Sequence, residues 1–141
     1  MDFKKKYLLQ IIKSNSDSEN VSWLETKVDF ITSKLSTKDL YITYSLIGTK
    51  FKKNNTLNVK IDHAELSTYL ELQKASIQEI ARIFLLKSVL EFNPDFFKDK
   101  VANIIQLADT SELETFLKFL VLLPNAEDYK FVAVEALRTN I

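Results

Sequence analysis

SIQEIARIFLLKSVLEF, residues 76–92, is the stretch that decides the fold of this chain. Ser76 and Glu79 have the spacing of a capping box, in which each side chain hydrogen-bonds the backbone N–H of the other at a helix start. The apolar residues that follow recur three and four positions apart, as one buried face of an α-helix requires. The stretch therefore predicts a helix with a buried face, formed by Ile77, Ile80, Ala81, Phe84 and Leu85.

Start signals of the same kind recur along the chain and predict about eight helices. The chain has only one glycine and two prolines, which disfavours both hairpin-rich sheets and glycine-rich nucleotide loops. Several links between helices are very short, and short links indicate antiparallel neighbours. We therefore expect an all-α fold in a single domain over residues 1–141, built as a HEAT/armadillo-like array or an irregular bundle of antiparallel helices.

Capping residues predict where individual helices begin and end. The second helix begins either at Ser22 or earlier, at Ser16 or Asp17. A third helix starts at Ser36 and ends at Gly48, since glycine is favoured just after a helix C-terminus. The later expected helices run from Asp62 or His63 to Leu72, from Asn93 to Leu107, from Ser111 to Pro124, and onward from Asn125.

Charge and composition exclude several classes of protein. Nineteen Lys and Arg residues balance nineteen Asp and Glu residues, so the chain lacks the basic surplus of nucleic-acid binders, and we expect no nucleic-acid partner. With no cysteine and His63 as the single histidine, it lacks the usual metal ligands, and we expect no metal and no cofactor. The longest apolar run, Phe119–Leu123, is far shorter than the roughly 20 residues of a membrane span. We expect a cytoplasmic protein with no transmembrane segment, for which peripheral membrane contact stays open.

The segment TKFKKNNTLNVKID, residues 49–62, interrupts the helical pattern. It contains Lys50, Lys52 and Lys53 but no glycine-rich turn, and its part LNVKI, residues 57–61, alternates as a short extended segment does. A lysine ammonium is a compact charge suited to phosphate, so the loop is a candidate for binding phosphate or a lipid headgroup. A solvated connecting loop is the simpler interpretation and stays open beside it.

Phenylalanines recur at helical spacing along the second half of the chain. Such a set can line a pocket for an apolar ligand, but core packing requires the same spacing. We therefore predict that these side chains belong to the core. They are Phe92, Phe96, Phe97, Phe116, Phe119 and Phe131.

The closing stretch, residues 129–137, is apolar at most positions. A helix that is apolar nearly all round is normally a central one, and we expect this helix at the centre of the fold. Glu135 and Arg138 are three residues apart and can pair along it; if buried, the pair would require further hydrogen bonds. Two roles stay open for the pair, a structural ion pair or a polar site inside the domain. We predict no catalytic residue, and the candidate binding residues are Glu135, Arg138, Asn140, Lys50, Lys52 and Lys53.

Three stretches carry a resemblance to a known family. Leu122–Pro124, Tyr129 and the closing EALRTN, residues 135–140, are similar in kind and order to the closing motif of the EboA family, which is encoded in ebo gene clusters. Upstream, residues 45–59 and 76–89 are similar to two further family segments, the second of them to a helix of pattern D-x-x-A-R-x-x-L-L. Family members continue beyond the closing motif, so the resemblance implies a shortened member or the N-terminal piece of a longer protein.

The resemblance implies an accessory protein without assigned catalytic machinery. Neighbouring ebo genes resemble isoprenoid transferases and sugar-phosphate enzymes, which implies a pathway that makes a membrane-linked metabolite and moves natural-product precursors. The first hypothesis is a non-catalytic helical protein that binds a protein partner or carries an apolar, prenylated or phosphorylated metabolite. The alternative is a small enzyme acting on such a metabolite, with Glu135 and Arg138 in a buried site and the lysine loop holding a phosphate.

Overall fold

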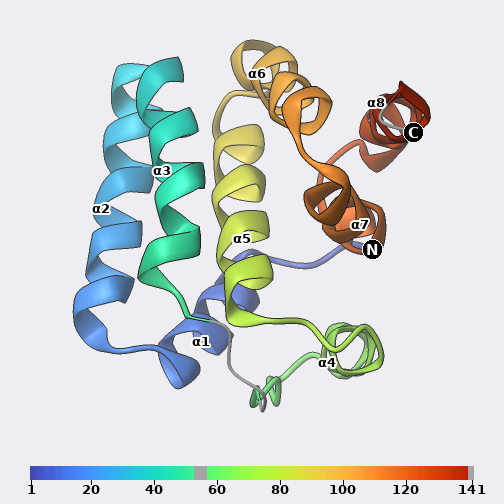
Figure 1. Cartoon of the computed structure of the whole chain (residues 1–141). Coiled ribbons are helices and arrows are strands. Elements are labelled where there is room, and N and C mark those ends of the chain that lie inside the picture. The colour runs from blue at the N-terminus through green and yellow to red at the C-terminus, as the bar shows by residue number, and fades with distance from the viewer. Residues whose placement is uncertain (53–56, 140–141) are drawn as a thin grey trace.

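A computed structural model describes residues 1–52 and 57–139, which form eight α-helices, one 3₁₀ turn and no β-strand (Figure 1). The all-α fold expected from the sequence is confirmed, whereas HEAT-like stacking stays a prediction. Among the described residues, no helix has the length and hydropathy that crossing a bilayer requires. The elements are α1 (Lys6–Asn15), α2 (Ser18–Lys34), α3 (Thr37–Lys50), α4 (Ala64–Leu72), α5 (Ile77–Phe92), α6 (Pro94–Leu107), α7 (Thr110–Phe119), the 3₁₀ turn η1 (Leu120–Leu122) and α8 (Ala126–Thr139).

Helix α5 lies in the middle of the molecule and packs against α1, α2, α3 and α6 (Figure 1). Eleven of its 16 residues are buried, and Leu85 and Leu86 have no exposed surface. The expected capping box starts it: the N–H of Glu79 donates to Ser76 Oγ at 3.2 Å, and the N–H of Ser76 donates to Glu79 Oε1 at 2.9 Å. Since buried apolar area contributes roughly 25 cal/mol per Å², the buried residues of α5 are a main source of the stability of this fold.

Side-chain caps also start the helices around α5. Asp17 accepts a hydrogen bond from the N–H of Asn20 at 2.8 Å, so α2 begins at the earlier of its two expected starts. Ser36 caps α3 through the N–H of Asp39 at 3.1 Å, and Asn93 caps α6. These side chains satisfy N–H groups that have no partner inside their own helix.

Two expected boundaries are wrong. Gly48 does not end α3, which continues past it, and the glycine lies inside the helix beside the side chain of Arg82. Ser111 does not cap helix α7, because Asp109 caps it two residues earlier in a box with Glu112. The N–H of Glu112 donates to Asp109 Oδ1 at 2.8 Å.

Irregular backbone replaces two other expected features. Residues 57–61 form neither helix nor strand, although Val59 is buried. Helix α7 ends at Phe119, and η1 carries the chain on toward Pro124. Leu122 and Leu123 in this region are buried, whereas Val121 is exposed.

One cluster of buried side chains runs from Phe3 to Ala136, and every helix contributes to it. Of the phenylalanines expected in the core, three are buried, namely Phe97, Phe116 and Phe119. Phe92 and Phe131 are instead 60% and 70% exposed. The first is the last residue of α5 and the second lies on the outer face of α8, so neither has a neighbouring helix to cover it.

The last helix, α8, lies at the edge of the fold and not at its centre (Figure 1). It packs against α6, α7 and η1, and its buried residues are Tyr129, Ala133 and Ala136. The expectation of a central helix is therefore wrong. Two of the three inward positions are small alanines, while the larger Phe131 and Val134 remain exposed.

Candidate functional site

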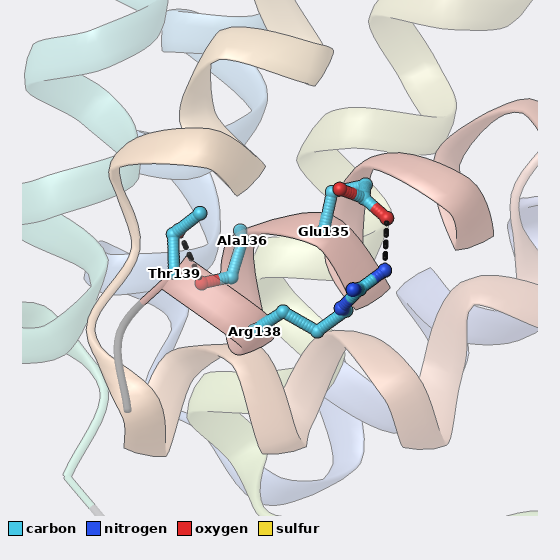
Figure 2. A network of polar contacts seen from close by, with 4 residues as sticks. All are labelled: Glu135, Ala136, Arg138 and Thr139. Atoms are coloured by element: carbon cyan, nitrogen blue, oxygen red, sulfur yellow. Dashed lines mark hydrogen bonds and ion pairs between the residues drawn. The ribbon is translucent and has the colours of Figure 1, made fainter.

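The predicted Glu135–Arg138 pair forms, but it lies on the surface of α8 (Figure 2). Arg138 Nη1 donates to Glu135 Oε1 at 3.2 Å, and the arginine and glutamate side chains are 73% and 46% exposed. The hypothesis of a buried polar site is wrong, because α8 turns this face toward solvent. An exposed pair of this kind stabilises a protein by about 0–1 kcal/mol. Asn140, predicted beside the pair, lies outside the described residues.

Two of the three predicted loop lysines, Lys50 and Lys52, line one open hollow of about 250 Å³ beside the start of α2. The Lys50 ammonium lies 5.4 Å from the centroid of the Trp23 ring, a cation–π distance. Asp17, which caps α2, lines the same hollow. Its negative carboxylate offsets part of the positive charge of the two lysines, so the hollow should bind an anion more weakly than the lysines alone would. Lys53 lies outside the described residues.

A larger open groove, of about 770 Å³, lies between the N-terminal segment and the end of α5, and we call it the N-terminal groove. It is lined by three consecutive lysines, Lys4–Lys6, and by the aromatic residues Phe3 and Phe92. Phe92 is an apolar wall of the groove that faces solvent, since 60% of its surface is exposed. The carboxylates of Asp2 and Glu91 also line it, which leaves a surplus of one positive charge.

A buried lysine lies behind this groove. Lys87 of α5 is only 5% exposed; its ammonium donates to the carbonyl of Leu122 at 3.2 Å and lies 4.3 Å from the centroid of the Phe3 ring. Burial lowers the pKa of Lys87, and the carboxylates of Glu91 and Asp2 partly oppose that shift. Phe3 therefore connects the groove to a desolvated amine in the core.

Arg82 is held over α3 by two contacts with one residue. Its Nε–H donates to the carbonyl of Tyr44 at 3.2 Å, and its guanidinium carbon lies 4.8 Å from the centroid of the Tyr44 ring. That ring is parallel to the ring of Phe116 from α7, with centroids 6.1 Å apart and planes 4° apart. These two contacts orient the arginine where α3, α5 and α7 meet.

Gly48 provides the space for the guanidinium. A Cβ atom built on Gly48 would lie 3.0 Å from Arg82 Nη2, closer than real Cβ contacts normally are. One turn along α5, Gln78 Nε2 donates to the carbonyl of Gly48 at 3.0 Å. Gln78 and Arg82 therefore reach from the same face of α5 to successive turns of α3.

Carboxylates near this arginine already have other partners. Glu79 accepts from the N–H of Ser76 and from Thr115 Oγ1 at 2.9 Å, and Glu112 belongs to the capping box of α7. Burial raises the pKa of Tyr44 far above its ordinary value; Arg82 opposes that rise, while Glu112 adds to it. The tyrosine therefore stays neutral throughout the neutral pH range.

Sequence reasoning found neither the N-terminal groove nor Arg82. The signal for the groove was the run Lys4–Lys6 directly after an aromatic residue. The signal for Arg82 was its rarity, because the chain has only two arginines, Arg82 and Arg138, among its 19 basic residues. Arginine is favoured over lysine where a planar, bidentate contact is needed.

Comparison with protein-family models identifies a family for this chain. The model of a family described as metabolite traffic protein EboA matches residues 4–141, which is nearly the whole chain. None of the curated proteins searched and none of the solved structures searched matches the sequence. The matched range includes Arg82, the exposed pair on α8 and all residues that line the groove except Asp2 and Phe3.

Proposed function

The chain belongs to the EboA family, and from that premise we propose that it binds an amphiphilic, anionic metabolite in its N-terminal groove and passes it on unchanged. It is then a non-catalytic helical accessory protein of an ebo-type pathway. The family description, which names metabolite traffic, supports this role. The observation that carries it is the combination in one groove of an exposed aromatic ring and a lysine run.

The two ends of such a ligand match the two kinds of wall in the groove. An apolar or prenyl chain covers Phe92, which otherwise exposes 60% of its surface to water, and covering apolar area is favourable by roughly 25 cal/mol per Å². A phosphate or similar anion meets the ammonium groups of Lys4–Lys6. Asp2 and Glu91 limit the net charge of the groove to plus one. The affinity for an anion is therefore moderate, and the ligand is able to dissociate, as a carrier requires.

The enzyme alternative receives less support from the structure. It requires Glu135 and Arg138 inside a pocket, whereas their side chains are 46% and 73% exposed. The lysine hollow that was to hold the phosphate contains the capping carboxylate of Asp17 as well. We further propose that the protein acts in the cytoplasm and contacts the membrane only at its surface.

Calorimetric titration with farnesyl diphosphate tests this function, because that probe has both an apolar chain and a charged group. We expect it to bind more tightly than farnesol, which lacks the charge, and than inorganic pyrophosphate, which lacks the chain. Phe92→Ala should weaken its binding roughly five- to thirtyfold, for about 1–2 kcal/mol of lost apolar contact. Lys5→Gln should weaken it by a smaller factor.

Two matched controls make the result specific to the groove. Phe131→Ala removes a similarly exposed phenylalanine from α8, and Lys130→Gln removes an exposed lysine from the same helix. Neither should change the affinity. Equal losses from Phe92→Ala and Phe131→Ala, or no binding of the diphosphate at all, would overturn the proposal.

A further inference from the structure

Arg82 is a half-buried cation whose donors are mostly unused. An arginine side chain has five N–H donors, and among the described residues this one donates a single hydrogen bond, from Nε to the carbonyl of Tyr44. The described part of the chain has one ion pair, and it belongs to Arg138. The edge of the Arg82 guanidinium formed by Nη1 and Nη2 therefore has no protein acceptor there.

The surroundings hold this edge in place without occupying it. The ring of Tyr44 lies under the guanidinium at 4.8 Å, and the missing side chain of Gly48 leaves room for Nη2. Glycine inside a helix is about 1 kcal/mol less favourable than alanine. The only glycine of the chain nevertheless lies inside α3, where the absence of a Cβ atom leaves space for Arg82. The fork is thus preorganised, which reduces the entropy lost when an anion binds.

We propose that the free edge of Arg82 is a second binding site, which takes the phosphate or carboxylate group of a small metabolite. Two parallel N–H donors of a guanidinium match two oxygens of either group in a bidentate contact. This site goes beyond the carrier function, because it requires no apolar chain and lies apart from the N-terminal groove.

The carboxylates at the junction set the strength of the site. Glu79 and Glu112 are committed to capping boxes, yet Glu112 and Asp109 still contribute a negative potential at Tyr44. That potential opposes an incoming anion. The site therefore selects for a bidentate oxyanion with good geometry rather than for negative charge in general.

Titration with inorganic pyrophosphate and, separately, with citrate tests the site and distinguishes phosphate from carboxylate. We expect one of the two anions to bind the wild-type chain, and Arg82→Lys to weaken that binding roughly tenfold, because lysine keeps the charge but loses the fork. Gly48→Ala should weaken it by several-fold, since its methyl group displaces Nη2. The melting temperature of Gly48→Ala should not fall below that of wild type, so a folding defect would not account for its lower affinity.

Two other variants separate this site from the rest of the surface. Arg138→Lys makes the same chemical change at the exposed arginine and should leave the affinity unchanged. Lys130→Gln removes an exposed lysine from α8 and should also have no effect on the binding of these short anions. The inference is overturned if neither anion binds, if Gly48→Ala binds like wild type, or if Lys5→Gln removes the binding while Arg82→Lys does not. The carrier function is judged separately, by the response of farnesyl diphosphate to Phe92→Ala.

Discussion

Helices α5 and α8 both have apolar residues at most positions, but they have opposite places in the fold. Eleven of the 16 residues of α5 are buried, against three of the 14 described residues of α8. The difference lies in their neighbours: α5 has α1, α2, α3 and α6 around it, whereas α8 packs mainly on α6, α7 and η1. An apolar pattern therefore indicates that a helix is suited to burial. Whether it is buried depends on how many other helices pack against it.

The same difference separates the two arginines. On α5, Arg82 lies against another helix, and its guanidinium is oriented by Tyr44 and accommodated by Gly48. On α8, Arg138 pairs with Glu135 of its own helix and is 73% exposed. One arginine is a fixed group available to a ligand, and the other is an ordinary surface ion pair.

The largest effect is expected from truncating a core side chain of α5. Leu85→Ala should lower the free energy of unfolding by about 2–5 kcal/mol, because the lost side chain is fully buried and leaves a cavity. Phe131→Ala on α8 removes a larger side chain that is 70% exposed and should change stability by less than about 0.5 kcal/mol. Urea denaturation of both variants gives the two values. Comparable losses would show that α8 is part of the core after all.

The next test is the pH dependence of stability, which should differ between wild type and Lys87→Met. The pKa of Lys87 is lowered in the folded state, so between that value and the ordinary 10.5 the unfolded chain binds more protons. Wild-type stability should therefore rise with pH through this window, and the methionine variant should lose that rise.

Two tyrosines limit the range of that measurement. Burial raises the pKa of Tyr129 to about 12, and it raises the pKa of Tyr44 as well. Their contribution to stability is present below the ordinary tyrosine pKa of 10.0 and is lost as the pH rises further. Melting curves should therefore be compared below pH 10. A parallel response of wild type and Lys87→Met would contradict the desolvated lysine.

A smaller and opposite effect is expected at the one glycine. Gly48→Ala should raise stability by up to about 1 kcal/mol, because alanine favours the helix and the clash is with the movable end of Arg82. Differential scanning calorimetry measures this change. A clear loss of stability would mean that the guanidinium cannot move and that the junction is held more rigidly than its single hydrogen bond suggests.

The smallest effect is expected from Arg138→Ala. The sequence alone suggested a buried pair whose loss would be costly, whereas the exposed geometry predicts a change of less than about 0.5 kcal/mol. Thermal denaturation at low and high salt checks it, since the small difference should disappear at high salt. A loss above about 2 kcal/mol would instead indicate that the Glu135–Arg138 pair is buried.

Local signals predicted the helices well, because a cap and an apolar period are properties of neighbouring residues. Ser76 with Glu79, Asp17 and Asn93 all cap helices as their chemistry requires. The place of α8 was not predictable in this way, since its alanines and its exposed Phe131 give the same apolar reading as a buried helix. The apolar pattern alone does not distinguish a helix at the edge of the fold, such as α8, from one surrounded by four other helices, such as α5.

The sites depend on contacts between distant parts of the chain, which no local pattern reveals. Arg82 and Tyr44 are 38 residues apart, and the N-terminal groove joins residues 2–7 to residues 91–92. The Glu135–Arg138 pair, by contrast, was predicted because its partners are three residues apart on one helix. Its exposure was missed for the same reason that α8 was misplaced.

The most direct test of the difference between the two arginines is a ¹⁵N NMR spectrum of their Nε–H groups, because the chain has only two arginines. The account predicts one slowly exchanging signal, from the hydrogen-bonded and half-buried Arg82, and one rapidly exchanging signal, from Arg138. Addition of the anion that binds should move the Arg82 signal and leave the Arg138 signal in place. Two rapidly exchanging signals, or a response confined to Arg138, would contradict it.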